Sequence, residues 1–128
     1  MGGGLYDGSS VSVNNSVGSP VEIVSTAPFG NDVNIDVSGD ISLLDVEGGW
    51  AGGALLANSL SEAQFMGDFG ADVALQQGLG CFEVFGGDIV SDSFGTGLAA
   101  GEGNGDAGCI QATAVGGVGG SMSGNFSI

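Results

Sequence analysis

The sequence contains no lysine, no arginine and no histidine among its 128 residues. Proteins that bind nucleic acids need basic side chains to replace phosphate counterions, and a P-loop needs its lysine. Without these residue types there is no Ser-His or Cys-His pair, no Schiff-base lysine, no imidazole ligand for a metal and no guanidinium group for an anionic substrate. These absences exclude nucleic-acid binding and most catalytic chemistry, so we expect a protein that is not an enzyme.

Long apolar runs are also absent. A membrane-spanning helix needs about 20 consecutive, mostly apolar residues, and the chain contains no such run. The first residues, MGGGLYDGSS, lack the basic and apolar regions of a secretory signal. Export would therefore need another route, or a leader that precedes these residues.

Negative charge has no partner of opposite sign in this chain. The 15 aspartate and glutamate residues give a net charge of −15, and no internal salt bridge can offset it. Repulsion among these acids must be relieved by salt, by metal cations, by low pH or by wide spacing. We therefore do not expect anionic membranes as partners, whereas divalent cations are plausible ones.

Glycine is abundant and spread through the chain. The 28 glycines indicate turns repeated between short extended segments rather than one flexible linker. Apolar and polar residues alternate, as in half-buried strands, in residues 11–17, 21–23, 33–37, 41–43, 110–114 and 122–128. These patterns predict an all-β fold of about eight short strands, arranged as a glycine-rich sandwich, barrel or solenoid. We expect one β-rich domain, 1–128, in which residues 1–20 could form an extended N-terminal arm.

One segment departs from this alternation. Around residues 59–66, Leu60 and Ala63 approach helical spacing, and Ser59 followed by Glu62 would make a capping box. The segment therefore predicts either one short helix near 59–66 or two more strands.

Oxygen-bearing side chains alternate along the stretch NDVNIDVSGD, at Asp32, Asn34, Asp36 and Asp40. Oxygen ligands at alternating positions suit Ca²⁺, but the glycine and the glutamate that complete an EF-hand loop are missing. The apolar residues between them instead describe a half-buried strand whose polar residues face solvent. The stretch is thus either a solvated strand face or a weak, or intermolecular, calcium site.

Cys81 and Cys109 are the only cysteines. With no second pair and no histidine, they cannot assemble a closed zinc site. A disulfide between them would close a loop of roughly 30 residues and stabilise the fold by roughly 3 to 4 kcal/mol in the chain-entropy model. We expect that disulfide, with two buried free thiols or two reactive thiols as the alternatives. Paired cysteines indicate an oxidising, extracellular or cell-surface setting.

The stretch FGADVALQQG, residues 69–78, resembles a repeat unit of the curlins, which are secreted bacterial fibre subunits. Such a unit carries glycine, then small or apolar residues, then glutamine, and Phe69, Gly70, Leu75 and Gln77 fit that order. The resemblance covers these ten residues and occurs once in the chain. It implies a stacked, β-rich secreted fibre with a ladder of glutamines, and it transfers no site residue.

Together these features predict a non-enzymatic extracellular structural subunit that assembles with copies of itself into a fibre, a pilus-like filament or a surface coat. Strand addition between subunits is the mechanism that suits short alternating segments. The alternative is a secreted, monomeric binding module or adhesin that uses a flat β face and bound cations. For either function we expect no organic cofactor, and calcium is the ion that the carboxylates would bind.

Overall fold

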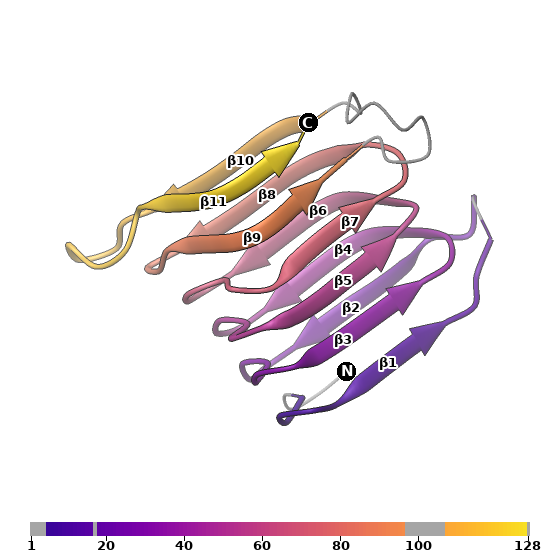
Figure 1. Cartoon of the computed structure of the whole chain (residues 1–128), viewed down its shortest axis with the longest axis horizontal. Helices are drawn as coiled ribbons and strands as arrows, with labels where there is room; N and C mark the ends of the chain where they lie inside the picture. Colours follow the sequence, from indigo (N-terminus) through magenta and orange to yellow (C-terminus); the bar gives the residue numbers. More distant parts are fainter. Residues whose placement is uncertain (1–4, 17, 97–106, 128) are drawn as a thin grey trace.

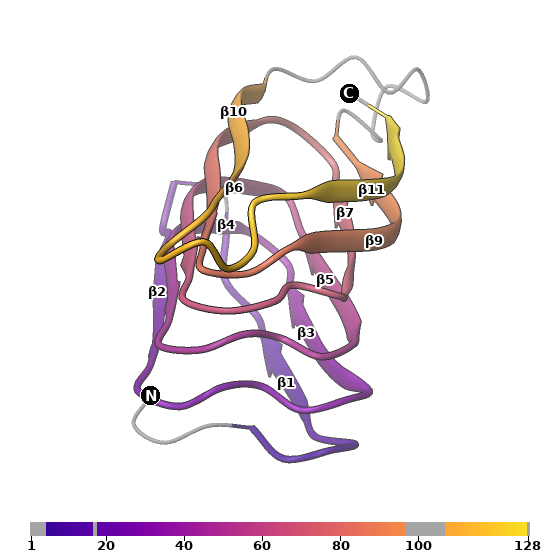
Figure 2. The same cartoon turned by 90° about the vertical axis from the view of Figure 1, so that its left-hand side faces the viewer.

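The chain winds into a two-sided parallel β-solenoid, in which each coil contributes one strand to each of two facing sheets (Figures 1 and 2). The computed structural model describes residues 5–16, 18–96 and 107–127, and these contain eleven strands and no helix. Sheet A consists, in spatial order, of β1 (Ser10–Val13), β3 (Val33–Val37), β5 (Gly53–Ala57), β7 (Asp72–Leu75), β9 (Ile89–Gly95) and β11 (Met122–Ser127). Sheet B consists of β2 (Val21–Ser25), β4 (Asp40–Val46), β6 (Ser59–Phe65), β8 (Leu79–Phe85) and β10 (Ala107–Thr113).

The predicted all-β fold is confirmed, and the solenoid is the arrangement that forms. All neighbouring strands pair in parallel, as strands of successive coils must when the chain keeps winding in one direction. The described residues form eleven strands rather than about eight, because residues 53–95 contain five strands in which glycine, alanine and paired polar residues weaken the alternation. The segment 1–20 contributes β1, whose Ser10 pairs in register with Asn34.

The core lies between the two sheets and is built from columns of inward-facing residues. In sheet B the same inward pattern recurs every 19 residues in three successive strands: Ile41, Leu44 and Val46; Leu60, Ala63 and Phe65; Leu79, Phe82 and Val84. In sheet A the predicted inward face of β3 is confirmed, since Val33, Ile35 and Val37 are all buried. Each coil therefore buries its apolar residues against the coils before and after it.

The possible helix near 59–66 is wrong, because these residues form strand β6. Leu60 and Ala63 face the core, whereas Ser61 and Glu62 between them both face solvent. Two successive outward residues turn the strand's period of two into an apparent step of three, which resembles helical spacing. Pairing with β4 and β8, which have the same irregularity, fixes the segment as a strand.

An aromatic column runs through the core along the axis of the solenoid. The ring of Trp50 makes edge-to-face contacts with Phe29 and Phe69, at centroid distances of 5.3 and 5.7 Å. The column continues from Phe69 to Phe82, from Phe82 to Phe94 and from Phe94 to Phe126, at centroid distances of 4.8, 5.0 and 5.2 Å. Such contacts add to the free energy gained by burying the rings, so they bind successive coils together.

Glycine is required where the backbones of successive coils approach most closely. Gly53 has φ of +121°, and a Cβ at this position would overlap the carbonyl oxygen of Val33 in the preceding coil. Its positive φ suits glycine and disfavours other residues. The glycines of this chain thus serve close stacking as well as turns.

Candidate functional site

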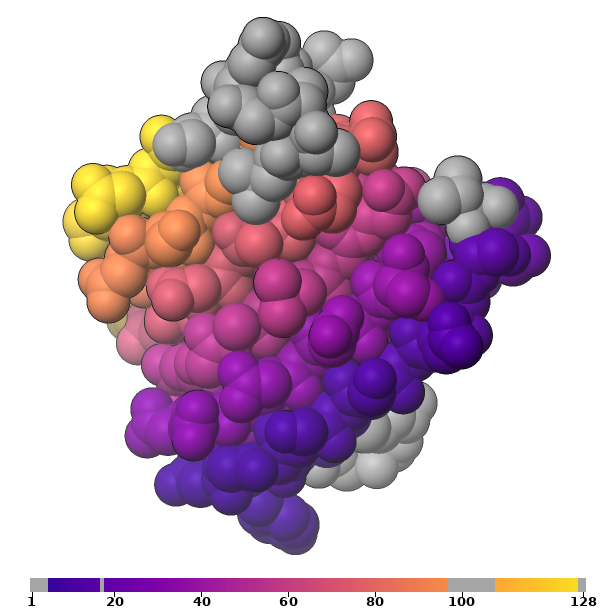
Figure 3. Space-filling model, turned by 45° about the vertical axis from the view of Figure 1, so that its right-hand side comes forward, coloured from indigo at the N-terminus to yellow at the C-terminus, as the bar shows by residue number. Residues whose placement is uncertain are grey.

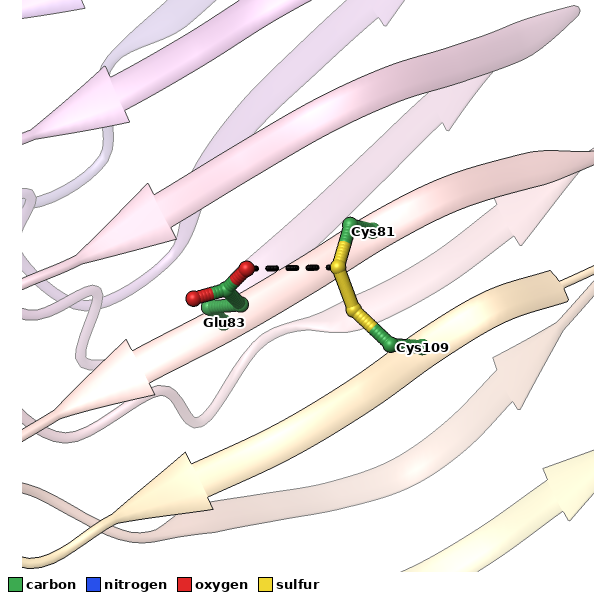
Figure 4. Close-up of side chains that lie close together, drawn as sticks. All are labelled: Cys81, Glu83 and Cys109. Carbon is green, nitrogen blue, oxygen red and sulfur yellow. Dashed lines mark hydrogen bonds between the residues drawn. A yellow bond between two sulfur atoms is a disulfide. The ribbon is translucent and has the colours of Figure 1, made fainter.

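The structure confirms the predicted disulfide between Cys81 and Cys109. Cys81 on β8 and Cys109 on β10 are register partners with Cα atoms 4.6 Å apart, and their sulfur atoms are bonded (Figure 4). Glu83 lies on the same face, with Oε1 3.2 Å from Cys81 Sγ. In the described part of the chain these three residues are the only group of three or more potential metal ligands close together. Because an oxidised sulfur is not a thiolate, the group lacks the ligands that a metal site would need.

The four residues of the predicted calcium site are divided between the two sheets. Asp32 occupies a left-handed turn (φ +54°) before β3, Asn34 Nδ2 donates to the carbonyl oxygen of Asp32 at 3.3 Å, and Asp36 is exposed on the outer face of sheet A. Asp40 begins β4 in sheet B. Calcium binding by these residues stays a prediction.

Asp40 is held by hydrogen bonds from neighbouring coils. Its Oδ1 accepts from Asn58 Nδ2 at 2.8 Å and from Ser59 Oγ at 2.7 Å, and its Oδ2 accepts from the backbone N–H of Gly18 at 3.4 Å. The hydrogen bonds from Asn58 and Ser59 are the main reason that the pKa of Asp40 lies below its ordinary value; burial opposes them, and the hydrogen bond from Gly18 adds a smaller lowering effect. This carboxylate joins three coils.

Backbone amides of the following coil hold further acids. Asp68 Oδ1 accepts from the N–H of Asp88 at 2.8 Å, and Asp88 Oδ1 accepts from the N–H of Ser121 at 3.0 Å. The backbone hydrogen bond from Ser121 lowers the pKa of Asp88. Asp7 accepts in the same way from the N–H of Asn31 at 2.8 Å. Sequence reasoning missed these contacts, although Asp68 and Asp88 recur one coil apart, each directly before a buried apolar residue.

Acids and amides alternate on the outer face of sheet B. Asp45, Gln64, Glu83 and Gln111 are successive register partners on β4, β6, β8 and β10. Because neighbouring strands lie about 4.8 Å apart, the two acids of this row are separated by roughly 10 Å. The row thereby avoids adjacent like charges.

A shallow groove of about 490 Å³ crosses three coils beside the aromatic column. It is lined by Trp50, Ala51, Asp68, Phe69, Gly70, Asp88, Val90 and Asp92. Two of its three carboxylates already accept backbone hydrogen bonds. The groove is thus acidic, but Asp68 and Asp88 in it already stabilise the stacking of the coils.

The two ends of the solenoid each present a pair of strands with an open edge. The coils stack in sequence order, so that β1 and β2 lie at one end and β10 and β11 at the other (Figures 1 and 3). Within residues 5–16, 18–96 and 107–127, none of these four strands has a partner on its outer side. An open edge offers unpaired N–H and C=O groups to another strand.

Apolar residues at both ends are incompletely covered. Val11 of β1 is only partly buried, whereas its register partner Ile35 in the next coil is fully buried. At the other end, Ile110 and Phe126 are partly buried and Met122 is 45% exposed. The core columns therefore stop at surfaces that a further coil would cover.

The end strands carry almost none of the charge. β1, β10 and β11 contain no Asp or Glu, and β2 contains only Glu22. Of the seven strands between them, all except β5 contain at least one acid. The strands between the ends therefore carry most of the acids found in strands, and the four end strands are nearly neutral.

Comparisons with family models, with curated proteins and with solved structures find no match to this chain. The described residues include no helix of the length and apolarity needed to cross a membrane.

Proposed function

We propose that this chain is a non-enzymatic extracellular structural subunit that assembles with copies of itself by strand addition at the ends of its solenoid. The product would be a fibre, a pilus-like filament or a surface coat. The observation that carries the proposal is the contrast between middle strands that carry acids and end strands that are nearly uncharged, partly apolar and open at their outer edges.

This contrast favours association end to end over association side by side. Two copies that approach by their sides bring like charges together, and no basic residue exists to compensate them. Two copies that approach by their ends bring together backbone hydrogen-bonding groups and apolar side chains, which is how strand addition gains its affinity. Subunits whose sides repel each other and whose ends pair would form a thread one subunit wide.

Location and lack of catalysis have separate support. The Cys81–Cys109 disulfide suits an oxidising compartment outside the cytoplasm. The absence of lysine, arginine and histidine leaves few groups for acid–base or nucleophilic chemistry.

Sedimentation velocity and electron microscopy of the purified, oxidised protein test the proposal. We expect species that grow with protein concentration, and threads as wide as one solenoid. A single species of 12.3 kDa at every concentration and salt level would overturn it and would favour the monomeric binding module with a flat β face.

Matched charge variants test whether the ends matter. Gln111 and Gln64 lie in the same outward row, but Gln111 belongs to the end strand β10 and Gln64 to the middle strand β6. Gln111→Glu should reduce assembly strongly, because it places charge at an end. Gln64→Glu adds the same charge to an acidic side and should reduce assembly far less. Equal effects would contradict assembly through the ends.

A further inference from the structure

The described strands alternate between the two sheets, and they begin and end in the same one. β1 and β11 both belong to sheet A, which therefore has six strands, whereas sheet B has five. Because the total number of described strands is odd, two copies can join their sheets in only some arrangements. The inference below rests on the proposed assembly through the ends.

Head-to-tail stacking satisfies only one of the two sheets. If β11 of one copy pairs with β1 of the next, sheet A continues without a break. The next strand along the winding should then belong to sheet B, but the second copy begins with another strand of sheet A. β10 and the β2 of the second copy would consequently lie about 10 Å apart, which is twice the spacing of paired strands. Both edges and the core between them would stay open in sheet B.

We propose instead that the ends join like to like, through a two-fold axis that lies between the sheets and runs along the strands. This rotation places sheet A of one copy over sheet B of the other. At one end β1 pairs with β2 of the second copy and β2 with its β1; at the other end β10 and β11 exchange partners in the same way. Because the strands of the two sheets run in opposite directions (Figure 1), the new pairs are antiparallel. Every open edge is then paired, and neither sheet has a gap.

The chemistry of the N-terminal end fits this junction. The inward residues Val11 and Val13 would continue the core beside Val21 and Ile23 of the second copy, all four of which are incompletely covered or lie at the edge of the core. The outward residues of β1 are Ser10 and Ser12. They would lie beside β2 of the second copy and so supply hydroxyl donors near its Glu22.

A direct pairing of β2 with β2 would be less favourable, because it brings the two Glu22 carboxylates to the same face. The like-to-like junction keeps them on opposite faces of the joined solenoid, since each Glu22 lies in its own copy's sheet B. Glu22, the only acid in the end strands, is thereby kept apart from Glu22 of the second copy.

The C-terminal end is complementary to itself in the same way. The exposed residues of β10 include Gln111 and Thr113, and β11 contributes exposed Ser123 and Asn125. These hydroxyl and amide groups are both donors and acceptors, so they suit any register of an antiparallel pair. Phe126 of one copy would cover the inward residues of β10 in the other.

Two self-complementary ends produce a thread without polarity, in which N-terminal and C-terminal junctions alternate. Each junction is isologous, meaning that the same surface is used by both copies. A head-to-tail thread would instead have one repeated junction and two different ends.

Blocking one end separates the two arrangements. The carbonyl oxygens of Ser9 and Val13 accept from the N–H groups of Asn34 and Ser38, so Ser12 turns its own N–H toward the open edge. On β2, the carbonyl oxygen of Ser25 accepts from the N–H of Glu47, the residue directly after β4. Ser25 therefore turns its backbone groups toward β4, and the N–H of the preceding residue, Val24, points toward the open edge.

The N-blocked variant combines Ser12→Pro with Val24→Pro, which removes one outward N–H from each end strand. The C-blocked variant combines Ala112→Pro with Met122→Pro on β10 and β11. Controls that keep every N–H are Ser12→Ala with Val24→Ala, and Ala112→Gly with Met122→Ala. Circular dichroism shows whether each variant keeps its strands.

Like-to-like joining predicts that each blocked variant stops at a dimer, of twice 12.3 kDa, while the parent chain and both controls polymerise. A mixture of the two variants, one of them isotopically labelled, should contain no mixed dimers by native mass spectrometry. Monomers of each variant alone, with mixed dimers on combination, would overturn the inference in favour of head-to-tail joining. Failure of the proposed function has a different result, since the parent chain itself would then stay at 12.3 kDa.

A second N-blocked variant guards against misfolding caused by proline. Ser10→Glu with Ser12→Glu keeps all backbone N–H groups but places carboxylates beside Glu22 of the second copy. It should also stop at a dimer through the C-terminal ends. Continued polymerisation of this variant would contradict the pairing of β1 with β2.

Discussion

Cys81 and Cys109 are register partners on adjacent parallel strands, and the disulfide between them fastens the last strand of sheet B to the coil before it. Among the strands that the structure describes, β10 has a paired neighbour on one side only. The covalent bond therefore reinforces one of the four end strands, each of which lacks a paired strand on its outer side within the described residues.

Removing this bond should destabilise the fold. We expect Cys81→Ala with Cys109→Ala to lower the free energy of unfolding by roughly 3 to 4 kcal/mol, because the unfolded chain regains the entropy of a long loop. Denaturant titration of the oxidised parent and the double variant measures the difference. Hydrogen exchange should show β10 opening first. Unchanged stability would mean that stacking alone holds the last coil.

The inward face of β3 predicts a large difference between neighbouring substitutions. Ile35 has no exposed surface and Asp36 is exposed. Ile35→Asp should cost about 3 kcal/mol or more, because it buries a carboxylate without a partner. Asp36→Asn should be nearly neutral, since it only removes one solvated charge. Thermal unfolding of the two variants compares them, and equal losses would refute the assignment of the faces.

Asp40 predicts a contribution to stability that depends on pH. Its pKa in the folded chain lies below the usual value of 3.8, chiefly because Asn58 and Ser59 donate to the carboxylate. The contribution is therefore present above pH 3.8 and is lost as pH falls through the lower pKa of the folded state.

Asp40→Asn should lower stability at neutral pH by about 1 kcal/mol, since a neutral amide accepts these hydrogen bonds less strongly. It should also flatten the loss of stability on acidification. Chemical denaturation from neutral to acid pH compares this variant with Asp36→Asn as the control for removal of a charge. Identical pH profiles would show that the contacts of Asp40 do not stabilise its charged form.

Cations should promote assembly through screening of the acidic sides. At an ionic strength of 0.1 M the Debye length is about 10 Å, so repulsion between whole subunits weakens while contacts at the ends remain. We expect light scattering to rise with sodium chloride and as pH falls toward the range in which carboxylates take up protons.

Calcium separates screening from a specific site. At equal ionic strength, calcium and sodium chloride should act alike if only screening operates. A greater effect of calcium that Asp32→Asn with Asp36→Asn abolishes would support the predicted cation site. Assembly that is indifferent to salt, pH and chelator would show that the acids only keep the sides soluble.

Much of the fold could be predicted because burial leaves a local pattern. Val33, Ile35 and Val37 alternate in sequence and lie buried in the structure. The pairing of the two cysteines followed from their number, since no other partner exists for either of them.

The rest depends on residues that meet only when coils stack. Asp40 binds Asn58 and Ser59, which lie 18 and 19 residues further along the chain. No local pattern marks such a contact. The recurrence of Ile41, Leu60 and Leu79 at a step of 19 residues could have indicated the contact of Asp40, because this step gives the length of a coil in sheet B. Inspection of one strand at a time does not detect such a recurrence.

That constant step makes the length of the molecule modular. Deleting residues 60–78 would bring Leu79 to the place of Leu60, Phe82 to that of Ala63 and Val84 to that of Phe65, so these three inward positions of sheet B would still meet apolar partners. Evolution or a designer could therefore shorten or lengthen this protein by one whole coil at a time, while the strands at both ends stay unchanged.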